Sequence, residues 1–559
     1  MSTVRNVMLT ETGSALGRLY ADATRFFLEE IDPAAHAAAY VGTHGSGFAE
    51  TEFAGKYMEI CVRYARMTGS GRALDAARTV AKAVSANQRE DGYIGGMEQG
   101  RETDDFSIWN QAFTLLGLVA YYEYTHEAFA LAAADRLVRW CAACFMTGKA
   151  DILSGTNNGS QHLSFLLPLV RLCRVRDEPL YRDFTQYIVG RIKGSDNDFF
   201  HFGSILDLRS KKGIENFVIL IGMLEYGELF GDAEALPACE KYWTELAETQ
   251  IRENGNGTNG EVWEKDGNRP QMLPVERFPD ENCVAVGWIE FCLALYFRTG
   301  KAKYLDAADQ SIYNHLLGAV GEAGEDFAYY QPNFGKRITH TGRTMYQCCR
   351  YRGYTAVSIL PQALFRARED VLDTVLYANA RYEDEEWTVW EQTAYPYRGD
   401  VTLRITVKCP GQRTLRLRVP SWADRLSPEL DGAAVEATPV DGWIQLTRAW
   451  TVGDHTVSLH FTPRLTVKRA EIDGEARACI MYGCILLAAV TDGPAPDGAW
   501  KTLGFDAGAA MTPTAAGPAR IAFTAANGTR FTDLASSGRN GQEFVVWALD
   551  TGTEIRAEE

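Results

Sequence analysis

The sequence predicts a helical toroid of six helix pairs, an (α/α)6 barrel, followed by antiparallel β-sandwich domains. Over residues 1–368, alanine, leucine and aromatic residues recur at helical spacing, and strand-like alternation is scarce. Within that region a helix–turn–helix pattern repeats at a period of roughly 50–70 residues. From about residue 370 the pattern changes to short runs that alternate between apolar and polar residues, as in strands.

The helical repeat has the same form throughout. One helix ends in an aromatic residue or leucine, a short turn follows, and the next helix begins with a large apolar residue. These turns fall within residues 64–74, 121–131, 172–181, 226–236 and 295–305. Counting outward gives about twelve helices, which as six hairpins fit a closed ring around a deep cleft. Loops at one end of the ring then carry the residues that meet a ligand.

Four loops are polar and rich in glycine, and most of them carry asparagine or aromatic residues. They span residues 42–47, 91–96, 154–162 and 255–267. Aromatic faces together with carboxylate and amide groups suit a neutral, hydroxyl-rich ligand such as a sugar. Glycine and asparagine also simply form turns, but four such loops in one helical domain favour a carbohydrate cleft. We expect a small-molecule or oligosaccharide substrate.

The second half of the chain predicts two β domains. Period-two runs at residues 401–407 and 414–419, with further strands up to residue 461, predict an antiparallel sandwich. Later strands at 478–490 and 544–548 predict a second β-rich unit. The expected domains are therefore a catalytic barrel (1–368), a β-sandwich (369–465) and a second β-sandwich or β-rich domain (466–559).

Charge and cysteine content exclude several classes of partner. The formal net charge of −17 over 559 residues argues against binding to nucleic acid or to an anionic membrane. The first twenty residues contain charged side chains and no continuous apolar run, so neither a signal peptide nor a membrane span is expected. The twelve cysteines are then expected to be reduced thiols in a cytoplasmic protein. A homodimer formed through the β domains is compatible with the sequence.

One carboxylate and three thiols come from two short segments, Glu281-Asn282-Cys283 and Cys348-Cys349. Three cysteines and a glutamate suit a tetrahedral zinc ion. A thiolate held by a metal is also a candidate nucleophile, because the metal keeps the sulfur deprotonated. Cysteine is a common small core residue as well, so the spacing alone leaves a structural role open.

Several segments resemble glycoside hydrolase family 127, which contains β-L-arabinofuranosidases. They span residues 304–314, 327–332, 392–397, 415–423 and 441–454. The resemblance implies an (α/α)6 catalytic barrel, β-sandwiches and a zinc ion held by Glu281, Cys283, Cys348 and Cys349. It also implies that Cys348 is the nucleophile of a retaining, exo-acting glycoside hydrolase.

The resemblance further implies a general acid/base, for which Glu261 in Gly260-Glu261-Val262-Trp263 matches the family segment. Glu264 and Glu276 are the alternatives. A retaining glycosidase needs a nucleophile on one side of the anomeric carbon and an acid on the other. We expect burial to raise the pKa of Glu261 toward neutrality.

The same resemblance implies sugar contacts at His162, Asp309 and Tyr329, and Trp109 completes the candidate substrate-binding residues. His162 can alternatively be an ordinary residue at the start of a helix. The chain also departs from the family. Phe113 stands where a histidine is usual, a second family histidine is missing near residues 212–216, and Arg350-Tyr351 replaces two prolines after the cysteine pair. A binding site that loses such hydrogen-bonding side chains recognises different hydroxyl groups of the sugar, so an altered sugar specificity is expected.

Two other functions stay open. The protein can be a non-catalytic sugar-binding protein in which the zinc is purely structural, since a closed four-ligand site is the usual structural arrangement. It can also be another toroid enzyme, an epimerase or lyase, with a histidine or tyrosine as its base.

Overall fold

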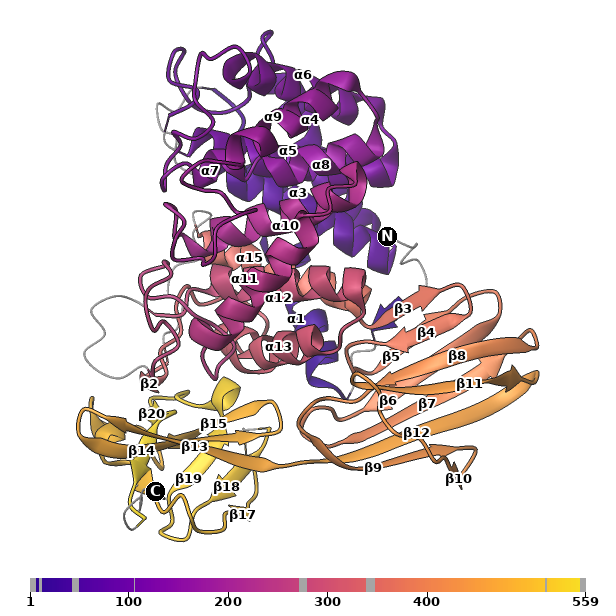
Figure 1. Cartoon of the computed structure of the whole chain (residues 1–559), viewed down its shortest axis with the longest axis vertical. Helices are drawn as coiled ribbons and strands as arrows, with labels where there is room; N and C mark the ends of the chain where they lie inside the picture. The colour runs from indigo at the N-terminus through magenta and orange to yellow at the C-terminus, as the bar shows by residue number, and fades with distance from the viewer. Residues whose placement is uncertain are drawn as a thin grey trace.

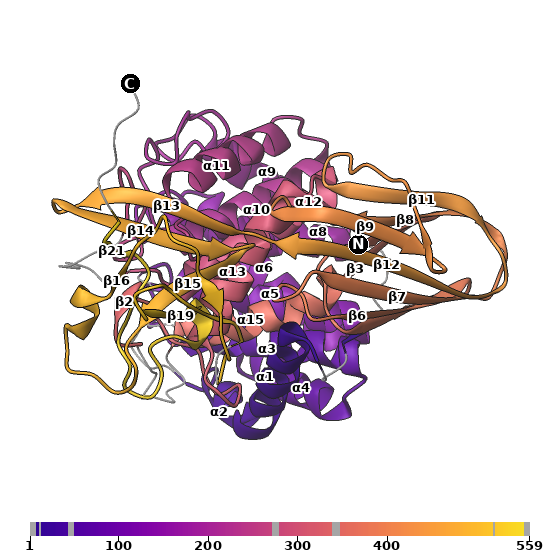
Figure 2. The ribbon, with the colours of Figure 1, turned by 90° about the horizontal axis from the view of Figure 1, so that it is seen from below.

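The computed structural model describes residues 7–9, 13–42, 50–104, 106–270, 279–337, 347–517 and 520–552. It has a helical domain and two β domains, which lie together at one side of the helices (Figure 1). Seen from below, the strands of both β domains extend across the helical domain (Figure 2). None of the helices in the described ranges is both long and apolar enough to cross a membrane.

Six inner helices form the ring that the sequence predicts. Each packs against the next, and the last packs against the first, so the ring is closed. The inner helices are α3 (Glu50–Thr68), α5 (Ser107–Thr125), α8 (Leu166–Val175), α10 (Gly213–Phe230), α12 (Asn282–Thr299) and α15 (Cys348–Ile359).

An outer helix accompanies each inner one. Five outer helices follow their inner partners in the chain, whereas α1 packs on α15 and so joins the beginning of the domain to its end. The outer helices are α1 (Ala15–Glu30), α4 (Gly71–Asn87), α6 (Ala128–Phe145), α9 (Pro179–Ile192), α11 (Ala235–Thr249) and α13 (Lys303–Ser311). Short helical segments complete the domain: α2 (Pro33–Ala38), α7 (Ser160–Leu163), the π-helix η1 (Ile312–Leu316), α14 (Leu317–Ala319) and the 3-10 helix η2 (Leu360–Ala363).

Glycines let the inner helices approach closely. A Cβ atom on Gly55 of α3 would lie 2.4 Å from the backbone carbonyl of Phe113 on α5. A Cβ on Gly353 of α15 would lie 2.2 Å from the ring of Phe327. Because such distances are impossible for real atoms, these positions accept only glycine without a backbone shift.

The first β domain is a sandwich of two sheets. The larger sheet has the order β1-β5-β6-β7-β12-β9-β10, and the smaller has the order β11-β8-β4-β3. Strand β1 comes from the N-terminus and pairs antiparallel with β5, with Val7 opposite Tyr382. The strands are β1 (Val7–Leu9), β3 (Phe365–Arg368), β4 (Val371–Thr374), β5 (Ala380–Glu383), β6 (Trp387–Thr393), β7 (Asp400–Val407), β8 (Gly411–Arg418), β9 (Ala423–Leu430), β10 (Ala433–Ala434), β11 (Trp443–Trp450) and β12 (Gly453–Pro463).

The second β domain is a single ten-stranded sheet, and one of its strands comes from the helical domain. Strand β2 (Phe334–Gly335) pairs with β20, so the two domains share a sheet. Asn314 of η1 adds a second connection by donating to the carbonyl of Cys484 at 2.8 Å. The other strands are β13 (Leu465–Ile472), β14 (Glu475–Tyr482), β15 (Ile485–Val490), β16 (Gly504–Phe505), β17 (Thr512–Pro513), β18 (Ala522–Thr524), β19 (Arg530–Asp533), β20 (Phe544–Val545) and β21 (Ala548–Asp550); a short 3-10 turn, η3 (Ala499–Thr502), and another, η4 (Leu534–Ser536), lie between them.

Candidate active site

The three predicted thiols and the glutamate converge at one end of the ring. The Sγ atom of Cys283 lies 2.9 Å from that of Cys348 and 3.2 Å from that of Cys349. The Cys349 sulfur lies 3.8 Å from a carboxylate oxygen of Glu281. All twelve cysteines of the chain are free thiols, and these separations exceed the S–S bond length of about 2.05 Å. The cluster is therefore a group of thiols, not a disulfide.

Two helix starts place this cluster. Cys283 lies in the first turn of α12, and Cys348 and Cys349 open α15. The backbone N–H groups at a helix start and the helix dipole both favour a negatively charged sulfur there. Glu281 is the N-cap of α12, but its side chain makes no capping hydrogen bond to the helix, which leaves its carboxylate available to the cluster.

A buried network fixes the chain on the other side of Glu281. Asp280, which is fully buried, forms an ion pair with Arg252 at 2.5 Å and accepts a hydrogen bond from Asn254 at 2.8 Å. Asn256 donates to the backbone carbonyl of Glu281 at 2.9 Å. The position of the carboxylate is therefore set by the loop that follows α11.

The residues present fit a soft divalent metal. Donor atoms of Glu281, Cys283 and Cys349 lie within 4.8 Å of one another, and all three residues are buried. One carboxylate oxygen of Glu281 is buried without a hydrogen-bond partner among the described residues. Burial raises the pKa of the Cys283 thiol well above its usual value, so the sulfur needs a nearby positive charge to become a thiolate. Thiolate sulfur and carboxylate oxygen are ligand types that zinc prefers, and Cys348, the fourth predicted ligand, is not in this group of three.

Glu261 lies beside this cluster in a strained turn. Its φ of 72° is in the left-handed region, which side-chain-bearing residues rarely adopt. The turn is held against the start of α10, because Gly213 donates to the Glu261 carbonyl at 3.0 Å and Trp263 donates to the Lys211 carbonyl at 2.9 Å. Strain of this kind is often retained where a side chain must be aimed at a ligand.

Lys212 connects the two carboxylates of the site. Its ammonium group is ion-paired with Glu261 and lies 3.7 Å from the unpartnered oxygen of Glu281. Tyr330 also donates a hydrogen bond to Glu261. Burial alone raises the pKa of Glu261, but the Lys212 charge and these hydrogen bonds outweigh it, so the pKa lies below its usual value. The sequence-based expectation of a raised pKa was therefore wrong for the site as it stands, because it did not include Lys212.

A second lysine, Lys56, contacts the sulfur of Cys348. The Nζ atom of Lys56, on α3, lies 3.4 Å from the Cys348 sulfur and forms an ion pair with Glu52 one turn earlier. The same ammonium group lies 4.4 Å from the centre of the Phe113 ring and 5.9 Å from that of Trp109. A buried cation thus contacts the predicted nucleophile and connects it to the aromatic wall of α5.

Trp109 and Tyr329 lie near this cluster, whereas the contacts of His162 in the described residues are with other segments. Trp109 is buried and packs edge-on against Phe113. The Tyr329 ring packs at a tilt against Tyr330, 4.6 Å between ring centres, and burial together with the nearby thiols and Glu281 raises the pKa of its hydroxyl. His162 is buried against Phe145, and its Nε2 atom has no partner among the described residues. An unpaired buried nitrogen is available to a ligand.

No contact among the described residues brings Asp309 to the cluster. It is fully buried, ion-paired with Arg418 of β8 and hydrogen-bonded by Tyr395, both of the first β domain. Its contacts therefore join α13 to the sandwich. The alternative acid Glu264 is ion-paired with Arg269 at 2.6 Å. Glu276 and most of the predicted loop at residues 42–47 lie outside the described residues.

Sequence reasoning missed Lys56, Lys212 and Tyr330. Glu52 and Lys56 are four residues apart, a spacing typical of an exposed helical salt bridge, and nothing local shows that α3 is an inner helix. The only signal for Lys212 is its position directly before the helix start at Gly213, in the segment where the family has a histidine.

Comparisons with known proteins agree with this architecture. The family model "Beta-L-arabinofuranosidase, GH127 catalytic domain" matches residues 4–361, and the model of the GH127 middle domain matches residues 373–462. A non-reducing end β-L-arabinofuranosidase of Bifidobacterium longum subsp. longum is 20% identical over 426 residues. That match spans 65% of this chain and 63% of the relative, less than two thirds of its length.

Solved structures share the whole fold. A GH127 β-L-arabinofuranosidase of Geobacillus stearothermophilus T6 superposes with a TM-score of 0.78 at 15% identity, over 97% of this chain and all of that one. A second GH127 β-arabinofuranosidase gives a TM-score of 0.77 at 18% identity, over 98% of this chain and 97% of that one. With its catalytic and middle domains both matched, the chain belongs to glycoside hydrolase family 127.

Proposed function

We propose that the protein is a retaining, exo-acting glycoside hydrolase in which Cys348 is the nucleophile and Glu261 the general acid/base. The observation that carries this proposal is the convergence of three thiols and Glu281 at one end of the ring, with Glu261 held beside them through Lys212. The relatives named above are arabinofuranosidases, so β-L-arabinofuranosides are the first substrates to test. Phe113 in place of one family histidine, and the absence of a second near residues 212–216, support an altered sugar preference.

The reaction follows from the positions of these side chains. The Cys348 sulfur attacks the anomeric carbon, the bond to the leaving oxygen breaks, and Glu261 gives that oxygen a proton. In the second half, Glu261 takes a proton from a water molecule whose oxygen attacks the same carbon, and the sulfur leaves. Two inversions give overall retention. A zinc ion held by Glu281, Cys283, Cys348 and Cys349 would keep the sulfur deprotonated.

Two lysines prepare the groups that react. Lys56 places a positive charge 3.4 Å from the Cys348 sulfur. Lys212 and Tyr330 fix the carboxylate of Glu261 by two hydrogen bonds. Because Lys212 lowers the pKa of Glu261, the protonated form needed for the first half becomes scarcer as the pH rises. We therefore expect acidic conditions to favour turnover.

The test is hydrolysis of a panel of 4-nitrophenyl furanosides and pyranosides that includes the β-L-arabinofuranoside. Cys348→Ser should reduce kcat/KM by a factor of about 10³ or more, whereas Cys144→Ser, on outer helix α6, should leave it unchanged. Proton NMR of the first-formed sugar reports the stereochemistry. A Cys348→Ser variant that retains full activity would falsify the nucleophile assignment.

The non-catalytic alternative has one observation in its favour, namely that Lys212 keeps Glu261 ionised in this structure. It predicts sugar binding that is unaffected by Glu261→Gln, together with no turnover by the parent protein. Metal analysis of the purified protein tests the proposed zinc ligands. One zinc per chain that is lost in Cys283→Ser supports the ligand set, and a metal-free, fully thiol-titratable protein contradicts it.

A further inference from the structure

A second cavity lies inside the ring, away from the thiol cluster. It has a volume of about 460 Å³ and is lined by all six inner helices. The thiols lie at the first turns of α12 and α15, whereas the cavity is bordered by residues further along each inner helix, such as Arg66, Arg174 and Arg298. It therefore occupies the opposite end of the toroid axis. Its size is within the range of small-molecule sites.

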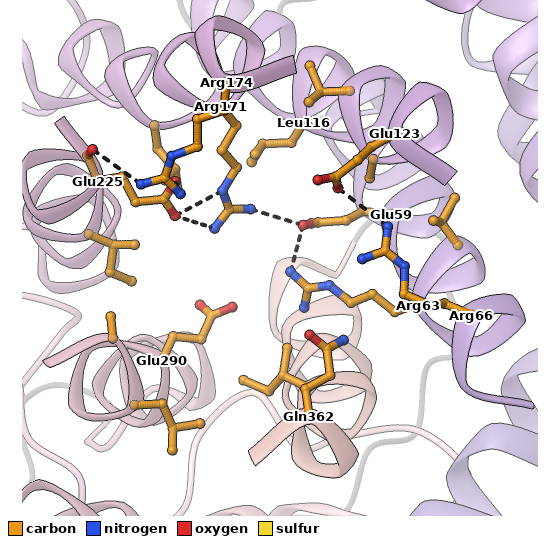
Figure 3. Close-up of a pocket in the computed structure, with 18 of the residues that line it drawn as sticks. Glu59, Arg63, Arg66, Leu116, Glu123, Arg171, Arg174, Glu225, Glu290 and Gln362 are labelled. Carbon is orange, nitrogen blue, oxygen red and sulfur yellow. Dashed lines mark hydrogen bonds and ion pairs between the residues drawn. The ribbon is translucent and has the colours of Figure 1, made fainter. Parts of the chain in front are cut away.

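Charged side chains line this cavity above an aliphatic wall. Six arginines and four glutamates border it, so the arginines are in excess. Figure 3 shows Arg171 and Glu59 on one side of an open space and Glu290 and Gln362 on the other. Aliphatic side chains also line the cavity, among them Leu116, Leu167, Ile221 and Leu293. Such a lining offers both ionic and apolar contacts to a single molecule.

Only three of the six arginines that line the cavity lie at the ends of helices. Arg66, Arg174 and Arg298 lie in the last turns of α3, α8 and α12. There their charges complement the carbonyl groups at the helix ends. The other three arginines lie before the last turns of their helices, and each is paired with a glutamate: Arg352 with Glu290, and the other two with Glu59. Arg63 and Arg171 both bind one oxygen of Glu59, at 2.6 and 3.3 Å.

The unpaired polar atoms of the lining are all donors. Among the described residues, Nη1 of Arg63, Nε of Arg298 and Nε of Arg352 are buried without a hydrogen-bond partner. Among the described residues that line the cavity, no acceptor atom is buried without a hydrogen-bond partner. The side chain of Arg352 is only 5% exposed and forms an ion pair with Glu290. Because six arginines face four glutamates around the cavity, a molecule that brings acceptor oxygens and a negative charge would be stabilised here.

We propose that this cavity binds a small organic carboxylate with an apolar body. Its carboxylate would accept hydrogen bonds from Arg63 and Arg352, because guanidinium and carboxylate groups match in shape and charge. Its body would lie on Leu116 and Leu293. The site is independent of the proposed hydrolysis, since neither the thiols nor Glu261 line it.

The cavity nevertheless adjoins the nucleophile. Phe113 lines it, and the face of the same ring carries Lys56, which contacts Cys348. Arg352 follows Cys348 by one turn of α15. A ligand bound by Arg352 would therefore lie about one helical turn along α15 from Cys348.

The test is a fluorine NMR titration of the full-length protein with 4-fluorobenzoate as probe. We expect saturable binding at millimolar concentration or below, and no comparable binding of 4-fluorobenzyl alcohol, which has the same body without the charge. Arg63→Gln should weaken binding by about tenfold or more. Leu116→Trp should abolish it by filling the cavity.

Arg139→Gln, on the exposed side of outer helix α6, is the matched control and should bind the probe as the parent does. Cys348→Ser should also bind normally, which separates this site from the catalytic cleft. Melting curves establish that each variant is folded. Equal binding of the alcohol, binding that survives Leu116→Trp in a folded variant, or no binding by the parent protein would each overturn the proposal.

Discussion

Replacing Arg418 with methionine should destabilise the protein without affecting the thiol cluster. Arg418 and Asp309 are both completely buried and form an ion pair between the first sandwich and α13. Removing one member of such a pair leaves the other as an uncompensated buried charge, which costs about 3–5 kcal/mol. Tyr395 remains as a donor to Asp309, so we expect the lower end, about 3 kcal/mol.

The size of the effect should depend on pH. Burial raises the pKa of Asp309 and Arg418 opposes that rise, so the variant should have a still higher folded-state pKa. A carboxyl group whose pKa is higher in the folded than in the unfolded protein favours folding while it is protonated. This stabilisation is fully present below the unfolded-state pKa and is lost as the pH rises through the folded-state pKa. The variant should therefore lose more stability at pH 8 than at pH 5.

Urea denaturation of the parent, Arg418→Met, Asp309→Asn and the double variant Asp309→Leu/Arg418→Met measures these effects. The double variant should recover most of the loss, because an apolar pair can replace a buried ion pair at little cost. Sugar affinity should stay the same in Asp309→Asn. If instead Asp309→Asn raises KM at unchanged stability, Asp309 is a sugar contact and the interdomain reading is wrong.

Three further changes test other parts of the structure. Lys212→Met removes the charge that lowers the pKa of Glu261, so the alkaline limb of the kcat/KM profile should move up by about one to three pH units; an unmoved limb means that Glu261 is not the acid. Burial raises the pKa of Glu215 to about 7, so the parent should lose roughly 3 kcal/mol between pH 4 and pH 8 relative to Glu215→Gln, and parallel melting curves would contradict this. Gly353→Ala pushes a methyl group into Phe327 and should lower stability by about 1–3 kcal/mol, whereas Gly190→Ala, with open space around it, should not.

The parts of the fold that depend on local sequence pattern could be predicted from the sequence. Helical periodicity and recurring turns predicted the ring, and period-two runs predicted the sandwiches. The candidate metal site could be predicted because two of its cysteines are adjacent in the chain and its glutamate and third cysteine are separated by a single residue. The structure brings Glu281, Cys283 and Cys349 together in a group that could hold a metal ion.

Contacts between distant segments could not be predicted in this way. Asp309 and Arg418 are 109 residues apart and belong to different domains, so no local signal pairs them. The three-residue strand β1 is too short to show period-two alternation, yet it extends a sheet formed by residues beyond 380. Lys56 was missed for a related reason, since an ion pair four residues apart has the same pattern on a buried helix as on an exposed one.

Closure of the ring also affects the order in which the protein can mature. Helix α15 fits between α12 and α3, and it is the last inner helix to leave the ribosome. Until it docks, α3 and α12 expose an apolar seam, and the metal ligands exist only as Glu281 and Cys283. Incomplete chains of this kind are prone to aggregate. A metal ion at the proposed site would then bind only after α15 has docked, and the metal-to-protein ratio of a preparation would report how many molecules have closed the ring.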